Sequence, residues 1–146
     1  MPKKPRNIEI TKRYNISSNR FKELYYYALQ YQEWKDELKY KYDTSKAMSV
    51  SGMPISNFNG SNSTEDAAVK CAELSHKINT VEAAARLADP DLYKYILKAV
   101  TSEGINYNYL KTVMDIPCSK NTFYDRRRKF YWILAQNMDE KKKNEK

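Results

Sequence analysis

The sequence predicts an all-α protein, a helical bundle that ends in a C-terminal helix-turn-helix. The first observation behind this prediction is that apolar residues recur three or four positions apart, as they do on one face of a helix. The second is a sustained run of alternating four- and three-residue spacings in the middle of the chain. The third is the order of elements over residues 91–136, which read as helix, glycine turn, short helix, break and long basic helix.

A chain of 146 residues suffices for one domain, or for one domain with an arm. We expect residues 1–45 to form a basic arm and a Tyr-rich helical region, and residues 46–63 to form a linker or long loop. Residues 64–137 are expected to form the helical helix-turn-helix domain. Residues 138–146 are expected to form a charged tail.

The Tyr-rich region is predicted to hold one or two helices. A polar cluster at residues 17–19 supplies a helix N-cap. Two apolar stripes at helical spacing follow it. They are Phe21, Leu24, Tyr25, Ala28 and Leu29, and then Tyr31, Trp34, Leu38 and Tyr42. The next stretch, residues 43–63, is rich in Ser, Asn and Gly and shows no sustained period, which is the basis for the linker.

The central segment carries the clearest helical pattern. Ser63 followed by Asp66 resembles a capping box with Asp in place of Glu. Apolar residues then recur at spacings of 4-3-4-3-4-3, namely Ala67, Cys71, Leu74, Ile78, Val81, Ala85 and Ala88. This spacing permits a coiled-coil dimer, whereas the small alanines favour a helix packed within its own chain.

The C-terminal segment is predicted to contain three more helices. Asp89-Pro90 ends the central helix and starts the next one, which Gly104 stops as a C-terminal cap. A short helix over residues 107–114 follows, with Leu110, Val113 and Met114 on one side. After a break at residues 115–117, a long helix begins near Ser119. Its apolar stripe, whose face Arg127 shares, is Phe123, Phe130, Ile133 and Leu134.

Composition argues against several classes of function. With glycine only at positions 52, 60 and 104, the chain contains neither a dinucleotide-binding nor a P-loop glycine motif. Two cysteines and one histidine do not make a four-ligand zinc site. Neighbouring carboxylates are explained by helix capping and solvation. We therefore expect no enzyme activity, no catalytic residue, no cofactor and no metal.

The N-terminus lacks the apolar core of a signal peptide, and no run approaches the ~20 apolar residues that span a bilayer. We expect a cytoplasmic protein without a membrane partner. Charge is uneven: residues 1–46 carry 11 basic and 6 acidic side chains, residues 47–118 carry 6 and 8, and residues 119–146 carry 9 and 4. A net charge of +8 concentrated at the two ends indicates a polyanionic partner.

We expect the helix over residues 119–136 to act as a recognition helix in the major groove of double-stranded DNA. Relative to its apolar stripe, the outward residues are Lys120, Asn121, Tyr124, Asp125 and Arg128. Lys and Arg suit guanine or phosphate, Asn suits adenine, and Tyr suits phosphate or a thymine methyl group. The hydroxyl of Ser119 and the helix N-terminus favour a nearby phosphate, and Arg126 and Lys129 are further phosphate partners. Arg127 is expected along the core edge.

The stretch LKTVMDIPCSKNTFYDRRR, residues 110–128, resembles the sigma-factor region-four-like helix-turn-helix of phage late-gene transcriptional regulators of the RinA and ArpU type. The likeness covers about residues 50–136. It implies a DNA-binding regulator from a prophage or mobile element that acts near a promoter, in the nucleoid of a bacterial host. By that resemblance Ser119, Thr122 and Tyr124 match the family's turn and first helical residues, and Arg128 matches its basic position. The chain departs from the pattern at Cys118, where the family has a small residue, and at Asp125, a carboxylate on the DNA face.

These observations predict a sequence-specific DNA-binding transcriptional regulator, whose N-terminal helices form homo-oligomers or contact RNA polymerase. One alternative is a DNA-packaging protein that resembles a terminase small subunit, which also joins a helix-turn-helix to oligomerising helices. Another is a protein-interaction inhibitor that reuses the same scaffold. Assembly into rings favours the first alternative, and an absence of salt-dependent DNA affinity favours the second.

Overall fold

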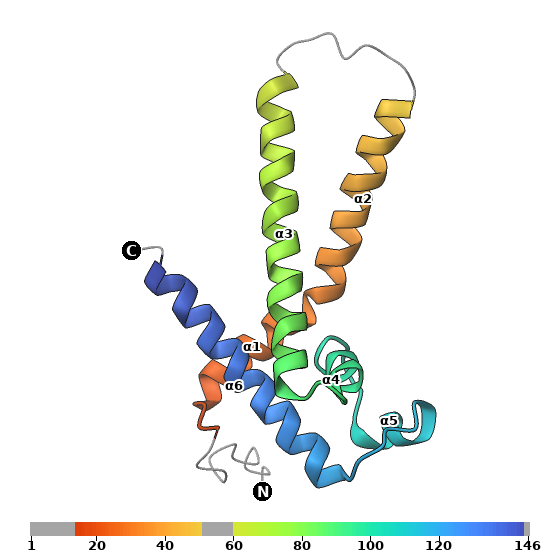
Figure 1. The fold of residues 1–146 in the computed structure, drawn as a ribbon, viewed down its shortest axis with the longest axis vertical. Helices are drawn as coiled ribbons and strands as arrows, with labels where there is room; N and C mark the ends of the chain where they lie inside the picture. The colour runs from red at the N-terminus through yellow and green to blue at the C-terminus, as the bar shows by residue number, and fades with distance from the viewer. Residues whose placement is uncertain (1–13, 51–59, 145–146) are drawn as a thin grey trace, which may run out of the picture. The chain divides into compact units, whose positions relative to one another are not determined.

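The protein is all-helical in a computed structural model that describes the backbone of residues 14–50 and 60–144 (Figure 1). Side chains are described for residues 14–43 and 65–140. These stretches contain no β-strand and form six helices: α1 (Ser18–Leu29), α2 (Tyr31–Val50), α3 (Gly60–Ala88), α4 (Tyr93–Val100), α5 (Tyr107–Val113) and α6 (Lys120–Asn144). The predicted all-α class is confirmed. The basic arm up to residue 13 and the middle of the predicted linker, residues 51–59, lie outside the described residues.

The chain divides into two compact units. One unit combines Met1–Gln30 with Thr80–Lys146, and the other is Tyr31–Asn79. The sequence placed its boundaries elsewhere, at residues 45 and 63, because composition changes there. The structural boundaries fall inside or beside helices, where the sequence shows no change.

The predicted linker is too long at both ends. Helix α2 continues to Val50, and α3 already begins at Gly60. Extending a formed helix by one residue adds a hydrogen bond for each residue fixed, so the polar residues beside a stable helix join it. Ser63, predicted at the N-terminal boundary of the central helix, therefore lies inside α3.

The unit of residues 1–30 and 80–146 is built around α6. Helix α6 packs on α1 and on α4, which also contact each other. The stripe predicted for α6 is confirmed, since Phe123, Phe130 and Leu134 have no exposed surface and Ile133 is buried. Other side chains with almost no exposed surface complete this core: Leu24, Ala28, Val81, Ala84, Ala85, Ile96, Val100, Leu110 and Ile116.

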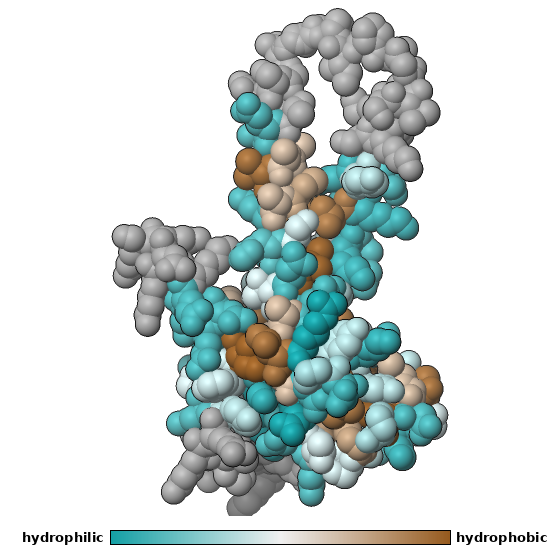
Figure 2. Space-filling model, viewed as in Figure 1, coloured by the Kyte–Doolittle hydropathy of each residue, from teal (hydrophilic) through white to brown (hydrophobic). Residues whose placement is uncertain are grey.

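The unit of residues 31–79 is built from α2 and the first part of α3. Tyr31 and Trp34 on α2 are buried, and the ammonium group of Lys77 lies 5.6 Å from the centre of the Trp34 ring. The predicted seam of α3 is buried only from Leu74 onward. Its beginning differs from the prediction, because Ala67 and the nearby Val69 are exposed. Tan and brown patches stand among teal ones on this part of the surface (Figure 2). The spacing shows which face is apolar, but not how far along the helix a partner covers it.

The turn between α3 and α4 is held by Asp89. Its Oδ1 accepts hydrogen bonds from the backbone N–H groups of Asp91 at 2.9 Å and Leu92 at 3.2 Å. Helix α4 consequently starts at Tyr93, three residues later than the start predicted at Pro90.

Helix α4 ends earlier than predicted, with Thr101 as its C-cap in place of Gly104. The Thr101 hydroxyl donates to the Leu97 carbonyl at 2.6 Å, which satisfies one of the last carbonyls of the helix. Gly104 instead lies in the loop between α4 and α5, where its φ of +75° is a conformation that glycine adopts readily.

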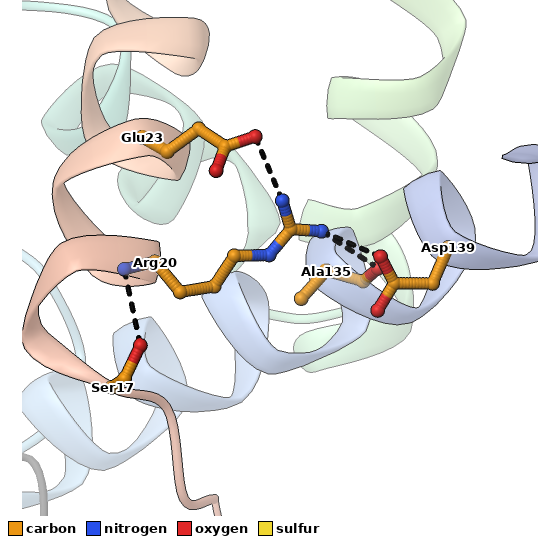
Figure 3. Close-up of polar contacts among 5 residues, drawn as sticks. All are labelled: Ser17, Arg20, Glu23, Ala135 and Asp139. Atoms are coloured by element: carbon orange, nitrogen blue, oxygen red, sulfur yellow. Dashed lines mark hydrogen bonds and ion pairs between the residues drawn. The ribbon is translucent and has the colours of Figure 1, made fainter.

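Arg20 on α1 forms polar contacts with α6 (Figure 3). The predicted cap of α1 is confirmed, because Ser17 Oγ accepts from the Arg20 backbone N–H at 3.2 Å. The Arg20 guanidinium reaches Glu23 and Asp139 at 2.8 Å each, and the carbonyl of Ala135 at 3.4 Å. The charged tail predicted from residue 138 is thus helical up to Asn144. Asp139, near the start of this segment, contacts Arg20 on α1.

Candidate functional site

The predicted recognition helix follows α5 and a sharp turn. The side chain of Asn106 caps α5 by accepting from the Tyr109 backbone N–H at 2.9 Å. Beyond the last turn, the N–H groups of Met114 and Ile116 both return to the Leu110 carbonyl at 3.2 Å. Asp115 lies between them at a φ of +53°, in the left-handed region that short polar residues tolerate best after glycine.

Two contacts hold this turn against the beginning of α6. Ile116 is fully buried, and the Tyr107 hydroxyl donates to the Cys118 carbonyl at 2.6 Å. The Tyr107 ring also lies 6.2 Å from the ring of Phe123. One residue of α5 differs from the prediction: Val113 is 61% exposed and does not share the buried side of Leu110. The short helix therefore meets the beginning of α6 through Tyr107.

The first turn of α6 exposes polar side chains to solvent and is held in place by one buried residue. Ser119 Oγ accepts from the Thr122 backbone N–H at 3.3 Å and lies 2.9 Å from Thr122 Oγ1, so it caps the helix as predicted. Lys120, Asn121 and the two hydroxyl residues are exposed, while Phe123, the next residue, is fully buried. An ammonium group, an amide and two hydroxyls thus face solvent from a helix end that cannot shift without disturbing the core.

The second turn of α6 is partly covered. Tyr124, Asp125 and the four cationic residues 126–129 are all half-buried. Arg126, predicted as a phosphate partner, lies beside two carboxylates within the protein. Its Nε lies 3.3 Å from Asp89 Oδ2, and its Nη1 lies 3.9 Å from Asp125 Oδ2. The Nε–H has no well-directed hydrogen bond, so the first contact is an ion pair by distance only. This leaves Arg126 less suited to bind phosphate than the sequence predicts.

The five predicted outward residues lie together and line an open pocket of about 520 Å³. The walls combine the beginning of the α1 segment with one face of α6: Ile16, Phe21, Lys120, Asn121, Tyr124, Asp125, Arg127, Arg128 and Tyr131. The sequence missed the contributions of Ile16, Phe21 and Tyr131. Arg127, expected along the core edge, also lines the pocket. The predicted stripes include Phe21 but neither Ile16 nor Tyr131, and periodicity carries no signal that α1 packs beside α6, about a hundred positions away.

Tyr131 lines this pocket but is almost completely buried. It is 2% exposed, and burial raises the pKa of its phenol from the usual value of about 10 to about 12, against an opposing effect of the nearby Arg127 guanidinium. The phenol is therefore neutral at physiological pH and offers a hydroxyl group without charge.

This shifted pKa predicts a loss of stability in alkali. The folded state keeps the Tyr131 proton that the unfolded chain releases above pH 10, so the stabilisation is complete below pH 10 and disappears as the pH approaches 12. Between pH 9.5 and 11, the free energy of unfolding of the wild type should fall by about 1 kcal/mol more than that of Tyr131→Phe. Chemical unfolding at each pH measures this difference. Parallel declines of the two proteins would contradict the assignment.

Three features of the described residues bear on metal binding, thiol reactivity and membrane insertion. In the part of the chain with described side chains, no three His, Cys, Asp or Glu residues gather where they could hold a metal ion. Burial, and then the nearby Asp89 carboxylate, raise the pKa of the Cys118 thiol, which disfavours a reactive thiolate. Among the described helices, none combines the length and apolar character needed to cross a membrane.

No protein-family model, curated protein or solved structure matches this chain. The likeness to phage late-gene regulators therefore rests on the motif around Ser119 and stays a prediction. The helix-turn-helix likewise rests on the order and local contacts of α5, the turn and α6.

Proposed function

We propose that the protein binds double-stranded DNA in a sequence-specific way through the beginning of α6, and that it regulates transcription. The observation that supports this proposal is that the first turn of α6 is exposed and capped, while Phe123 in the same turn is buried and fixes its position. In a helix-turn-helix, residues near the N-terminus of the second helix contact base edges. Lys120 and Asn121 occupy these positions and carry the groups that suit guanine and adenine.

Backbone contacts to DNA are available beside the same turn. The free N–H groups at the start of α6 and the positive end of its dipole favour a phosphate near Ser119. Arg128 and Lys129, one turn further on, keep part of their surface exposed and are less constrained than Arg126. The resemblance to prophage regulators agrees with this arrangement and suggests a site of action in the nucleoid of a bacterial cell.

A direct test is fluorescence anisotropy with labelled duplex DNA at 50 and 200 mM salt. Each phosphate contact contributes about −0.9 to the slope of log affinity against log salt. Lys120→Ala should weaken binding at 50 mM salt and make this slope less steep by about 1. The matched control is Lys94→Ala, which removes the same charge from an exposed position on α4.

Two results would contradict the proposal. One is an absence of binding at 50 mM salt. The other is a change in slope for Lys94→Ala that equals the change for Lys120→Ala, because the binding would then depend on net charge and not on the beginning of α6.

A further inference from the structure

The pocket beside α6 contains more aromatic surface than contact with a duplex requires. The Phe21 and Tyr131 rings meet edge to face with their centres 4.9 Å apart. Tyr124 adds a third ring, and its hydroxyl-bearing side chain lines the same pocket. A major-groove contact uses the edges of stacked bases, whereas aromatic walls fit the face of a base that has left its stack.

The polar groups of the pocket match the rest of a nucleotide. Lys120, Arg127 and Arg128 contribute three positive charges against the single carboxylate of Asp125, so an anionic group is favoured. The Arg127 guanidinium lies 5.1 Å from the centre of the Tyr124 ring, which joins the cationic side of the pocket to its aromatic side. The exposed amide of Asn121 carries one donor and one acceptor group, the pair that an adenine edge requires.

The size of the pocket suits one small ligand. Its volume of about 520 Å³ lies within the range of about 300–1,000 Å³ found for small-molecule sites. Every lining residue comes from the unit of residues 1–30 and 80–146, so the pocket belongs to one compact body.

We propose that this pocket binds a single unstacked nucleotide, with its base against Phe21 and Tyr124 and its phosphate near Arg127. The inference rests on the proposed function for its source of nucleotides, an unpaired position at the end of a bound DNA. A free nucleotide carries the same chemistry and is the other source. The consequence is that the protein prefers DNA with an unpaired end over blunt duplex DNA.

The experiment compares three probes that carry 2-aminopurine, a base whose fluorescence falls when it stacks on an aromatic ring. They are a duplex with one unpaired 2-aminopurine at its end, the blunt duplex with the same base paired, and free 2-aminopurine nucleotide. Base stacking on aromatic side chains supports a preference of about tenfold for the unpaired end. Fluorescence should fall on binding of that probe.

Phe21→Leu is the informative variant, because it removes a ring from the pocket while keeping an apolar side chain. Phe21→Tyr restores the ring. The matched control is Tyr26→Leu, which removes a ring that is 61% exposed on the same helix and does not line the pocket. Phe21→Leu should abolish the preference for the unpaired end, whereas Phe21→Tyr and Tyr26→Leu should keep it. A thermal melt of each variant confirms that it is folded.

The outcomes separate this proposal from the proposed function. Equal affinity for both duplexes without a fall in fluorescence overturns the nucleotide pocket and leaves duplex binding standing. If neither duplex binds, the proposed function fails, and the free nucleotide then tests whether the pocket binds a nucleotide. A fall in its fluorescence that Phe21→Leu removes supports the pocket, and an unchanged fluorescence overturns it.

Discussion

Replacement of Phe130 by alanine is expected to lower the free energy of unfolding by about 3–5 kcal/mol. Phe130 has no exposed surface, and its ring centre lies 5.0 Å from that of Tyr131. It belongs to the helix that packs on both α1 and α4, so neither neighbour can fill the cavity without moving. A loss of this size is a large part of the ~5–15 kcal/mol that stabilises a typical domain.

Urea unfolding followed by circular dichroism measures this loss, with Val113→Ala as the matched control. Val113 is also apolar and helical but 61% exposed, so its truncation should change the free energy of unfolding by less than about 0.5 kcal/mol. If Phe130→Ala unfolded at the same urea concentration as the wild type, the orientation of α6 about its own axis would be wrong.

Replacement of Arg128 by alanine is expected to weaken specific DNA binding by about 1–3 kcal/mol and to change the preferred base at one position, as for an arginine that contacts a guanine. Arg128 is half-buried at the rim of the α6 pocket, and its removal leaves Phe130 and Leu134 in place. The variant should therefore keep a wild-type melting temperature to within a few degrees.

Arg86→Ala is the matched control for this variant. Arg86 is an exposed arginine near the end of α3, its guanidinium lies over Tyr93, and neither residue lines the pocket. It should bind DNA with the wild-type base preference. Equal losses of affinity for the two variants would contradict a specific role for Arg128.

The buried face of α6 and that of the later part of α3 could be predicted from the sequence, whereas Tyr42 on the stripe predicted over residues 31–42 is 67% exposed. The recurrence of Phe123, Phe130 and Leu134 identifies the covered side of α6, and all three are fully buried. The alternating spacing through α3 does the same from Leu74 onward. Both predictions rest on helical geometry, which places residues three, four and seven positions apart on one face.

Contacts between residues far apart in the chain could not be predicted in this way. Arg20 and Asp139 form a contact across 119 positions, and each belongs to a charged stretch that gives no sign of its partner. The same limit applies to Arg126, which the sequence places on a basic face and the structure places beside Asp89. Periodicity states which side of a helix is covered, but not which element covers it.

The sequence predicted which residues of the candidate site share a face, but not the shape of the site. Lys120, Asn121, Tyr124, Asp125 and Arg128 do share one face, as their spacing requires, and the first turn of α6 is exposed. The sequence did not show that Phe21 from α1 faces them across a pocket. That arrangement depends on the packing of α1 on α6, which involves residues far apart in the chain.

The central claim is that the beginning of α6 recognises a DNA sequence, and a selection from random duplex DNA tests it most directly. The protein and Arg128→Ala are each incubated with the pool at 50 and 200 mM salt, and the retained DNA is sequenced. We predict that the wild type enriches one motif, that the variant loses part of it, and that less DNA is retained at the higher salt. Retention without a motif would contradict sequence recognition and favour a packaging role, and no retention at 50 mM salt would contradict DNA binding itself.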